Sequence, residues 1–254
     1  EGWFTNSNGG YSFLVGYTHG YYAYFLTLVD RVSVRWLESG TIGRVDDGFL
    51  RTMLWGALWD QVRAAQISPV RFVQLLLAEL PGERDEQIVP VLLGRLERSL
   101  RAYVPESERE RLRHVTERVL WEGANNGSKP YGTRKAFLDA FVSLAASSDG
   151  VARLEVLLVA DSAAGEPVRD PTRWEVVNRL VVLGAPGAER ALAAQSASDT
   201  TPDGRRRTFT AGAARNSATS KFDYFKRYFE DKALNEDWAS GSLGAFNAVE
   251  HQAL

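Results

Sequence analysis

The chain has 254 residues, of which 44% are hydrophobic and 24% charged, and its formal net charge is -2. This composition excludes bulk disorder, and the near-neutral charge disfavours a nucleic-acid binder that uses a broad basic surface. The sequence has no cysteine, which excludes disulfides, thiolate metal sites and thiol nucleophiles. The three histidines, His19, His114 and His251, lie too far apart in sequence for a local zinc motif.

The N-terminal segment combines turn residues with aromatic and β-branched residues. Between Trp3 and Tyr17 this pattern predicts a short hairpin or strand pair. The charge-free stretch Tyr11–Val29 is long enough to cross a bilayer, but it is rich in tyrosine, glycine, serine and threonine. We therefore expect a buried strand or turn followed by a packed helix, and no membrane association. No signal-peptide pattern precedes it, so a cytoplasmic location is expected.

Everything after this segment is predicted to be helical, from the apolar periodicity and from start and stop signals. The expected helices are 46–65, 70–80, 85–103, 106–122, 133–146, 149–160, 171–183, 187–196, one near 211–215, 219–232, and a last one from 235 onward. Short loops join them, as between antiparallel neighbours. The predicted fold is therefore mainly α, a HEAT- or armadillo-like α-solenoid of antiparallel helix pairs with a short N-terminal β segment.

Local signals support several of these helices. Ser68-Pro69 is a typical N-cap followed by proline at the first helical position, and Pro90 is expected in the first turn of its helix or at a kink. In 46–65 the apolar stripe runs along one face, and Trp55 and Trp59 lie on another. A helix that is apolar on two faces is expected to be buried on both sides.

Three segments resemble the C-terminal helical domain of the aminopeptidase N family of zinc metallopeptidases, in its bacterial branch. Phe49–Arg63 contains LWGALWD and is similar to the family's LLWGALWD helix, and Ser68–Pro81 is similar to the helix that follows it. Asp170–Gly184, with its Arg-Trp pair, and Tyr228–Asn247 are similar to later family segments in the same order. The resemblance is to an endoplasmic-reticulum-aminopeptidase-like domain. It extends over essentially the whole chain, but the matching residues are sparse.

The resemblance implies a domain organisation. Residues 1–18 would be the end of a preceding β-domain, and residues 19–254 the helical C-terminal domain, truncated at its C-terminal end. The family's zinc site uses an HExxH motif and its substrate amine is held by a GAMEN loop, and this sequence contains neither. The chain is therefore expected to hold no metal and to catalyse nothing, with zinc in the catalytic domain of a parent aminopeptidase.

The resemblance also implies partners. The expected partners are the catalytic and β-domains of the parent enzyme, and peptide substrates in a chamber that the domain encloses. Arg173 is the candidate for a chamber-facing residue, although a cation–π contact with Trp174 would make it structural. A truncated solenoid exposes an apolar face, so self-association or a partner at the C-terminal end is also expected.

Other chemically suggestive residues have plainer explanations. The carboxylates Glu106, Glu108, Glu110, Glu166 and Asp170 are typical of solvated surfaces.

His114 is expected to be structural, Arg205–Arg207 to lie in a solvated loop, and Asp199–Thr201 to cap a helix. Gly241–Gly244 lacks the spacing of a nucleophile elbow.

Two other hypotheses stay open. One is a free-standing α-solenoid scaffold that binds another protein. A start codon just upstream of the chain would support the scaffold, whereas an in-frame HExxH motif upstream would support the aminopeptidase domain. The other is a small membrane-anchored helical protein, which detergent-free solubility would disfavour.

Overall fold

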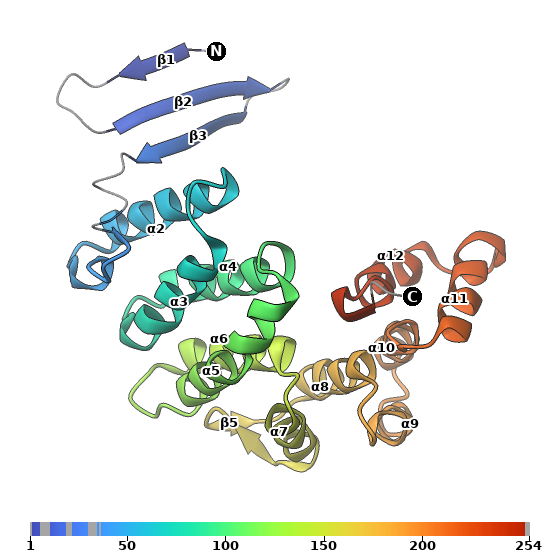
Figure 1. Cartoon of the computed structure of the whole chain (residues 1–254). Coiled ribbons are helices and arrows are strands. Elements are labelled where there is room, and N and C mark those ends of the chain that lie inside the picture. The colour runs from blue at the N-terminus through green and yellow to red at the C-terminus, as the bar shows by residue number, and fades with distance from the viewer. Residues whose placement is uncertain (1, 6–10, 19–21, 30–34, 36, 252–254) are drawn as a thin grey trace. The chain divides into compact units, whose positions relative to one another are not determined.

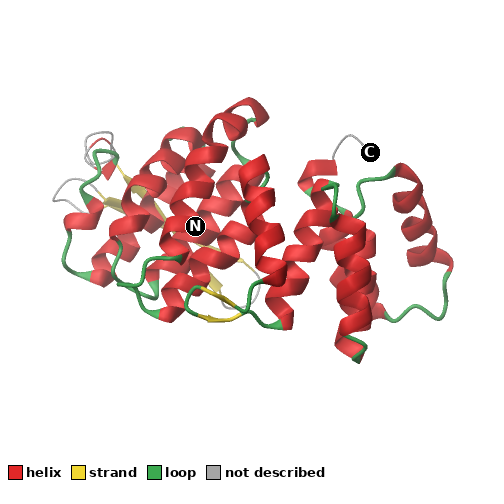
Figure 2. Ribbon diagram, turned by 90° about the horizontal axis from the view of Figure 1, so that it is seen from below, coloured by secondary structure: helices red, strands yellow, loops and turns green. Residues whose placement is uncertain are grey.

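The computed structural model describes residues 2–5, 11–18, 22–29, 35 and 37–251 (Figure 1). Contacts divide the chain into two units, Glu1–Ala124 with Ser128–Phe137, and Asn125–Gly127 with Leu138–Leu254. Helix α6 (Tyr131–Leu144) begins in the first unit and ends in the second. Helices dominate both units, and the described strands form two small sheets (Figure 2).

The first unit begins with a three-stranded antiparallel sheet of order β1-β2-β3. Its strands are β1 (Gly2–Thr5), β2 (Tyr11–Thr18) and β3 (Tyr22–Val29). The predicted strand pair is confirmed by β1 and β2. The prediction that the chain is helical from residue 19 is wrong at β3, where aromatic and apolar residues pair with β2 over the whole strand instead. Residues 6–10 and His19 lie outside the described residues.

The helices of the first unit follow closely the predicted order and ends. They are η1 (Ile42–Arg44), α2 (Gly48–Arg63), α3 (Pro69–Glu79), η2 (Leu80–Gly82), α4 (Ile88–Ala102) and α5 (Glu106–Ala124). Ser68 caps α3 by accepting from the backbone N–H of Arg71, and Pro69 is the first helical residue, as predicted. Pro90 lies in the first turn of α4.

The apolar surface of α2 is only partly buried. Trp55 is fully buried with its ring edge-on to Phe72, at 6.3 Å between centroids, and Trp59 packs on the same ring at 5.7 Å. Leu50 and Met53, at the start of the predicted stripe, are exposed. The prediction that α2 is buried on both sides is therefore wrong at Leu50 and Met53.

A buried ion pair joins α2 to the loop before α4. The guanidinium of Arg51 donates to both carboxylate oxygens of Glu83, at 3.0 and 3.1 Å. It also donates to the carbonyls of Val45 and Asp46, at 2.7 and 2.9 Å. The ammonium of Lys129 donates to the backbone carbonyl of Glu83 at 3.1 Å. The network ties three loops of this unit together.

The second unit contains the later helices and one short hairpin. Its elements are α7 (Ser148–Val159), β4 (Ser162–Ala163), β5 (Glu166–Pro167), α8 (Asp170–Leu183), α9 (Ala188–Ser198), α10 (Pro202–Ala213), α11 (Ala218–Glu230), α12 (Glu236–Phe246) and η3 (Val249–His251). Gly184 ends α8 in the left-handed conformation, with φ 62°, which glycine adopts without strain. Successive helices from α7 to α11 contact each other, and α12 contacts α10.

The end of the second unit packs around aromatic side chains. Phe209 and Tyr224 are buried there, with the partly buried Tyr228, Trp238 and Phe246 packed against them.

Another face of α11 carries exposed aromatic side chains. Phe222, Phe225 and Phe229 are exposed along it, spaced three and four residues apart. The self-association expected at this end of the chain stays a prediction.

The described residues thus confirm a mainly α fold with an N-terminal β segment. The stacking of helix pairs into a HEAT- or armadillo-like solenoid stays a prediction, as do the boundary between residues 18 and 19 and the truncation at the end. None of the described helices is long and apolar enough to cross a membrane.

Candidate functional site

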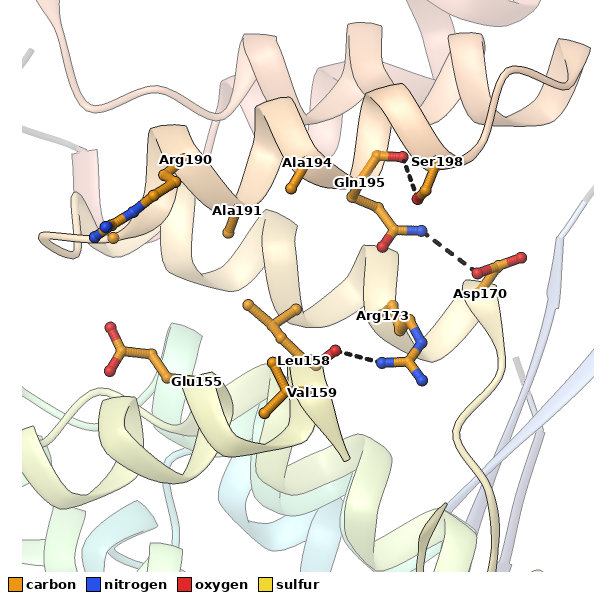
Figure 3. A pocket seen from close by; sticks show the side chains of 11 residues that line it. Glu155, Leu158, Val159, Asp170, Arg173, Arg190, Ala191, Ala194, Gln195 and Ser198 are labelled. Atoms are coloured by element: carbon orange, nitrogen blue, oxygen red, sulfur yellow. Dashed lines mark hydrogen bonds between the residues drawn. The ribbon is translucent and has the colours of Figure 1, made fainter. Parts of the chain in front are cut away.

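Arg173, the residue singled out from the sequence, lies in the first turn of α8. Its guanidinium donates to the backbone carbonyl of Leu158, and at 3.1 Å to that of Ala160 (Figure 3). Both carbonyls belong to the C-terminal end of α7, where the helix leaves acceptors without intrahelical donors. A cation at this end also interacts favourably with the helix dipole. Arg173 therefore caps α7, and only part of its side chain faces solvent.

Next to Arg173 is a hollow of about 650 Å³ between α7, α8 and α9, which we call the Arg173 hollow. Figure 3 shows Glu155 and Arg190 at one end and Asp170 with Gln195 at the other. The amide of Gln195 donates to Asp170 at 3.5 Å.

The wall between the two ends of the Arg173 hollow is apolar. It is formed by Leu158, Val159, Ala191 and Ala194. Val159 is exposed, so apolar surface here is open to solvent. An apolar wall with hydrogen-bonding groups at both ends matches the chemistry of a peptide segment, which offers amides, carbonyls and side chains.

Trp174 forms its hydrogen bond with a different element from Arg173. Its indole N–H donates to the carboxylate of Asp199 at 2.8 Å, whose other oxygen accepts from the hydroxyl of Thr201 at 2.6 Å. These hydrogen bonds, the one from Thr201 first, lower the pKa of Asp199. The predicted cation–π pair of Arg173 and Trp174 is not among the contacts of the described residues, because the two side chains point to different elements.

The predicted helix cap is confirmed. Thr201 accepts from the backbone N–H of Gly204 at 3.0 Å and so begins α10, with Pro202 as its first residue. The basic run Arg205–Arg207 consequently lies in α10, and the prediction of a loop there is wrong. Within the run, Arg206 pairs with Asp203 at 3.4 Å on the same helix.

The carboxylates considered from the sequence do not form a site together. Glu108 and Glu110 pair with arginines three residues further along α5, Arg111 and Arg113. Glu106 is exposed at the start of the same helix.

The two remaining carboxylates are in the second unit. Glu166 lies in β5, and Asp170 begins α8 at the edge of the Arg173 hollow. Neither has a second carboxylate among the hydrogen-bond partners described for it.

The described histidines and acids do not fit a zinc ion. His114 is exposed on α5, whereas His251 is buried with Nε2 within 2.7 Å of the carbonyl oxygen of Val182. Within residues 37–251 and the described strands, no group of three histidine, aspartate or glutamate side chains could hold a metal ion. We therefore derive no chemical step through zinc for these residues.

The segment Gly241–Gly244 lies inside α12 and not at a strand-to-helix turn. Ser242 is fully buried, and its hydroxyl contacts the carbonyl of Ala239 at 2.9 Å and the hydroxyl of Tyr228 at 2.7 Å. This serine is a packing residue of the aromatic end of the second unit.

Sequence reasoning did not identify most of the residues that line the Arg173 hollow. Glu155, Arg190 and Gln195 lie on helices whose spacing along the chain gives no sign that they meet. The signal that indicated this part of the chain was the Arg173-Trp174 pair, which the family resemblance had singled out.

Comparison with known proteins identifies the family of the chain. The family model of the ERAP1-like C-terminal domain matches residues 19–254. A curated relative, Aminopeptidase N of Streptomyces lividans, is 27% identical over 217 residues, which are 84% of this chain and 25% of the relative. The chain thus spans about a quarter of the length of the relative it matches. We conclude that the chain belongs to the ERAP1-like C-terminal domain family.

Proposed function

We propose that this chain is the non-catalytic C-terminal helical domain of an aminopeptidase-N-like zinc metallo-aminopeptidase. In this proposal it caps the catalytic domain and shapes the chamber that receives peptide substrates. The observation that carries the proposal is the family match over residues 19–254, together with the relative named as Aminopeptidase N. The proposed partners are the catalytic and β-domains of the same enzyme, which would hold the zinc.

The Arg173 hollow supports the part of the proposal that concerns peptides. Its apolar wall and its polar ends offer both kinds of contact that a peptide needs. Arg173 itself would act as a positioning residue, since its guanidinium fixes the end of α7 that forms one side of the hollow. Glu155 and Arg190 are then the charged groups that a peptide would meet at one end of the hollow, and Asp170 is the carboxylate at the other.

The experiment is a domain exchange in the Streptomyces lividans relative. In the hybrid protein, this chain replaces the matching region of the relative. In the truncated protein, that region of the relative is deleted. Both are checked for zinc content and thermal melting, then assayed on aminoacyl amides and on peptides of increasing length. We expect the hybrid to hydrolyse amides and to discriminate peptides by length, and the truncated protein to lose that discrimination.

A variant of the hybrid covers the case in which the truncated protein does not fold. Glu155→Ala combined with Arg190→Ala removes both charges at one end of the hollow, and Arg118→Ala, on the exposed surface of α5, is the matched control. We expect the double variant, and not the control, to change the dependence of kcat/KM on peptide length. Identical length dependence in all three proteins would contradict the proposal.

The isolated chain tests the non-catalytic part directly. With zinc added, it is expected to give no turnover of an aminoacyl amide. Clear zinc-dependent turnover that copurifies with the chain would overturn this part.

A further inference from the structure

A second hollow, of about 580 Å³, lies at the aromatic end of the second unit between α9, α10, α11 and α12. We call it the Arg227 hollow. It shares no lining residue with the Arg173 hollow. Nothing in the proposed function depends on it.

The floor of the Arg227 hollow is aromatic and held in place by hydrogen bonding. The rings of Phe209 and Tyr224 lie 5.0 Å apart, and the ring of Trp238 lies 5.6 Å from that of Phe209. The hydroxyl of Tyr224 donates to the backbone carbonyl of Phe209 at 2.9 Å. Burial raises the pKa of Tyr224, which keeps this donor protonated. Phe209 and Tyr224 are buried, at 6% and 9% exposed, so they back the hollow. The half-buried Trp238 is the lining aromatic side chain that an aromatic or aliphatic side chain could contact.

The position of Gly212 explains how close α10 and α11 come. A Cβ atom at Gly212 would lie 2.2 Å from the hydroxyl oxygen of Tyr224. Only glycine leaves room for the tyrosine that forms the floor.

Three arginines line the Arg227 hollow, and one of them is neutralised. Arg215 donates to both carboxylate oxygens of Glu189, at 2.8 and 2.9 Å. This bidentate geometry is the strong form of an arginine–carboxylate pair. Glu189 also lines the hollow, so this pair leaves no net charge there.

The other two arginines are not neutralised. The guanidinium of Arg227 lies over the rings of Phe209 and Tyr224, at 4.6 and 5.4 Å from their centroids. The guanidinium of Arg205 donates to the backbone carbonyl of Thr200 at 2.7 Å. Among the described residues, neither of the two has a carboxylate partner within the distance of an ion pair.

We propose that the Arg227 hollow binds an acidic peptide segment, in which two carboxylate side chains flank an apolar residue. The apolar residue would lie against the half-buried Trp238, and Arg227 and Arg205 would each bind one carboxylate. Charge complementarity favours this occupant, because two cations are uncompensated at the rim of one apolar surface. A nucleic acid is disfavoured, since phosphate-driven binding needs many basic groups and the chain has a net charge of -2.

The test uses the isolated chain and calorimetric titration. The probe is the blocked pentapeptide acetyl-Gly-Glu-Phe-Glu-Gly-amide, which has no free terminal charge. Its isostere with glutamine at both glutamate positions is the ligand control, and a short oligothymidylate is the competing ligand. We expect binding of the acidic peptide, weakened by added salt, and binding about tenfold weaker for the isostere, because charge-assisted hydrogen bonds are lost.

The variants are chosen on the same helices. Arg227→Gln and Arg205→Gln are each expected to weaken binding by about tenfold. Arg206→Gln is the matched control, because Arg206 also lies on α10 but pairs with Asp203 and does not line the hollow. Thermal melting checks the fold of each variant. Arg227→Lys keeps the charge, and is expected to retain most of the binding even where the glutamine variant is unstable.

Four results would overturn the proposal. They are the absence of measurable binding, equal binding of the acidic peptide and its isostere, equal losses in the Arg206 and Arg227 variants, and tighter binding of the oligothymidylate. Each of them leaves the proposed role in an aminopeptidase untouched, because that role is tested by peptide hydrolysis in a different protein.

Discussion

Removing the guanidinium of Arg51 perturbs a buried ion pair of the first unit. Arg51 and Glu83 are only 5% and 6% exposed. The change Arg51→Met leaves the carboxylate of Glu83 without its counter-charge. It also leaves the carbonyls of Val45 and Asp46 without the donors that they have now.

The expected loss follows from this burial. Breaking a buried pair by removing one partner costs about 3–5 kcal/mol, because the remaining charge is uncompensated. The matched control is Arg63→Met on the same helix. Its pair with Asp60 has a single contact at 3.4 Å, and the arginine side chain is 58% exposed. The carboxylate of Asp60 is only 17% exposed, but because the arginine end of the pair lies in solvent, the pair should contribute about 1 kcal/mol.

The assay is urea unfolding followed by circular dichroism, with hydrogen exchange to locate the loss in the first unit. We expect Arg51→Met to lower the unfolding free energy several times more than Arg63→Met. Adding Glu83→Gln to Arg51→Met removes the uncompensated charge, so the double change should cost at least about 1 kcal/mol less than the sum of the single changes. Equal effects of Arg51→Met and Arg63→Met, or additive single changes, would refute the reasoning.

Three further changes test packing and electrostatics. In Gly123→Ala the new Cβ would lie 2.4 Å from a ring carbon of Phe137, so the unfolding free energy should fall by about 1–3 kcal/mol. Gly94→Ala in α4 has nothing within 4 Å and should raise it by about 1 kcal/mol; equal effects in urea unfolding would contradict this. The hydrogen bond from Arg215 lowers the pKa of Glu189, so their pair stabilises the fold above the ordinary carboxyl pKa and is lost as pH falls through the lowered value. Glu189→Gln should therefore reduce the loss of stability in acid, by less than about 1 kcal/mol because the pair is exposed, and an unchanged pH dependence of the urea midpoint would contradict it.

Helix positions could be predicted from the sequence because their signals are local. Ser68-Pro69 and Thr201-Pro202 combine an N-cap side chain with proline at the first helical position, and both begin helices in the structure. These signals act over three or four residues, so a single sequence is sufficient to detect them. The family resemblance had the same basis, in segments such as Phe49–Arg63.

Contacts between distant residues could not be predicted in this way. Glu83 is 32 residues from Arg51, and nothing in either neighbourhood indicates that they pair. The error at β3 has a related cause: apolar and aromatic residues in Tyr22–Val29 suit a helix or a strand, and pairing with β2 decides between them.

The two hollows show the same limit. Each is lined by residues from at least three helices, and only the folded chain brings these residues together. The composition gave no sign of them, because the net charge of -2 sums over the whole chain and does not show the two arginines at the Arg227 hollow that have no carboxylate partner among the described residues.

The most direct test of the central claim is the dependence of kcat/KM on peptide length in the domain-exchanged relative. The account predicts that the hybrid carrying this chain discriminates peptides by length, while the zinc-loaded truncated protein does not. Equal length dependence in the two proteins would contradict the claim that this domain shapes the peptide chamber.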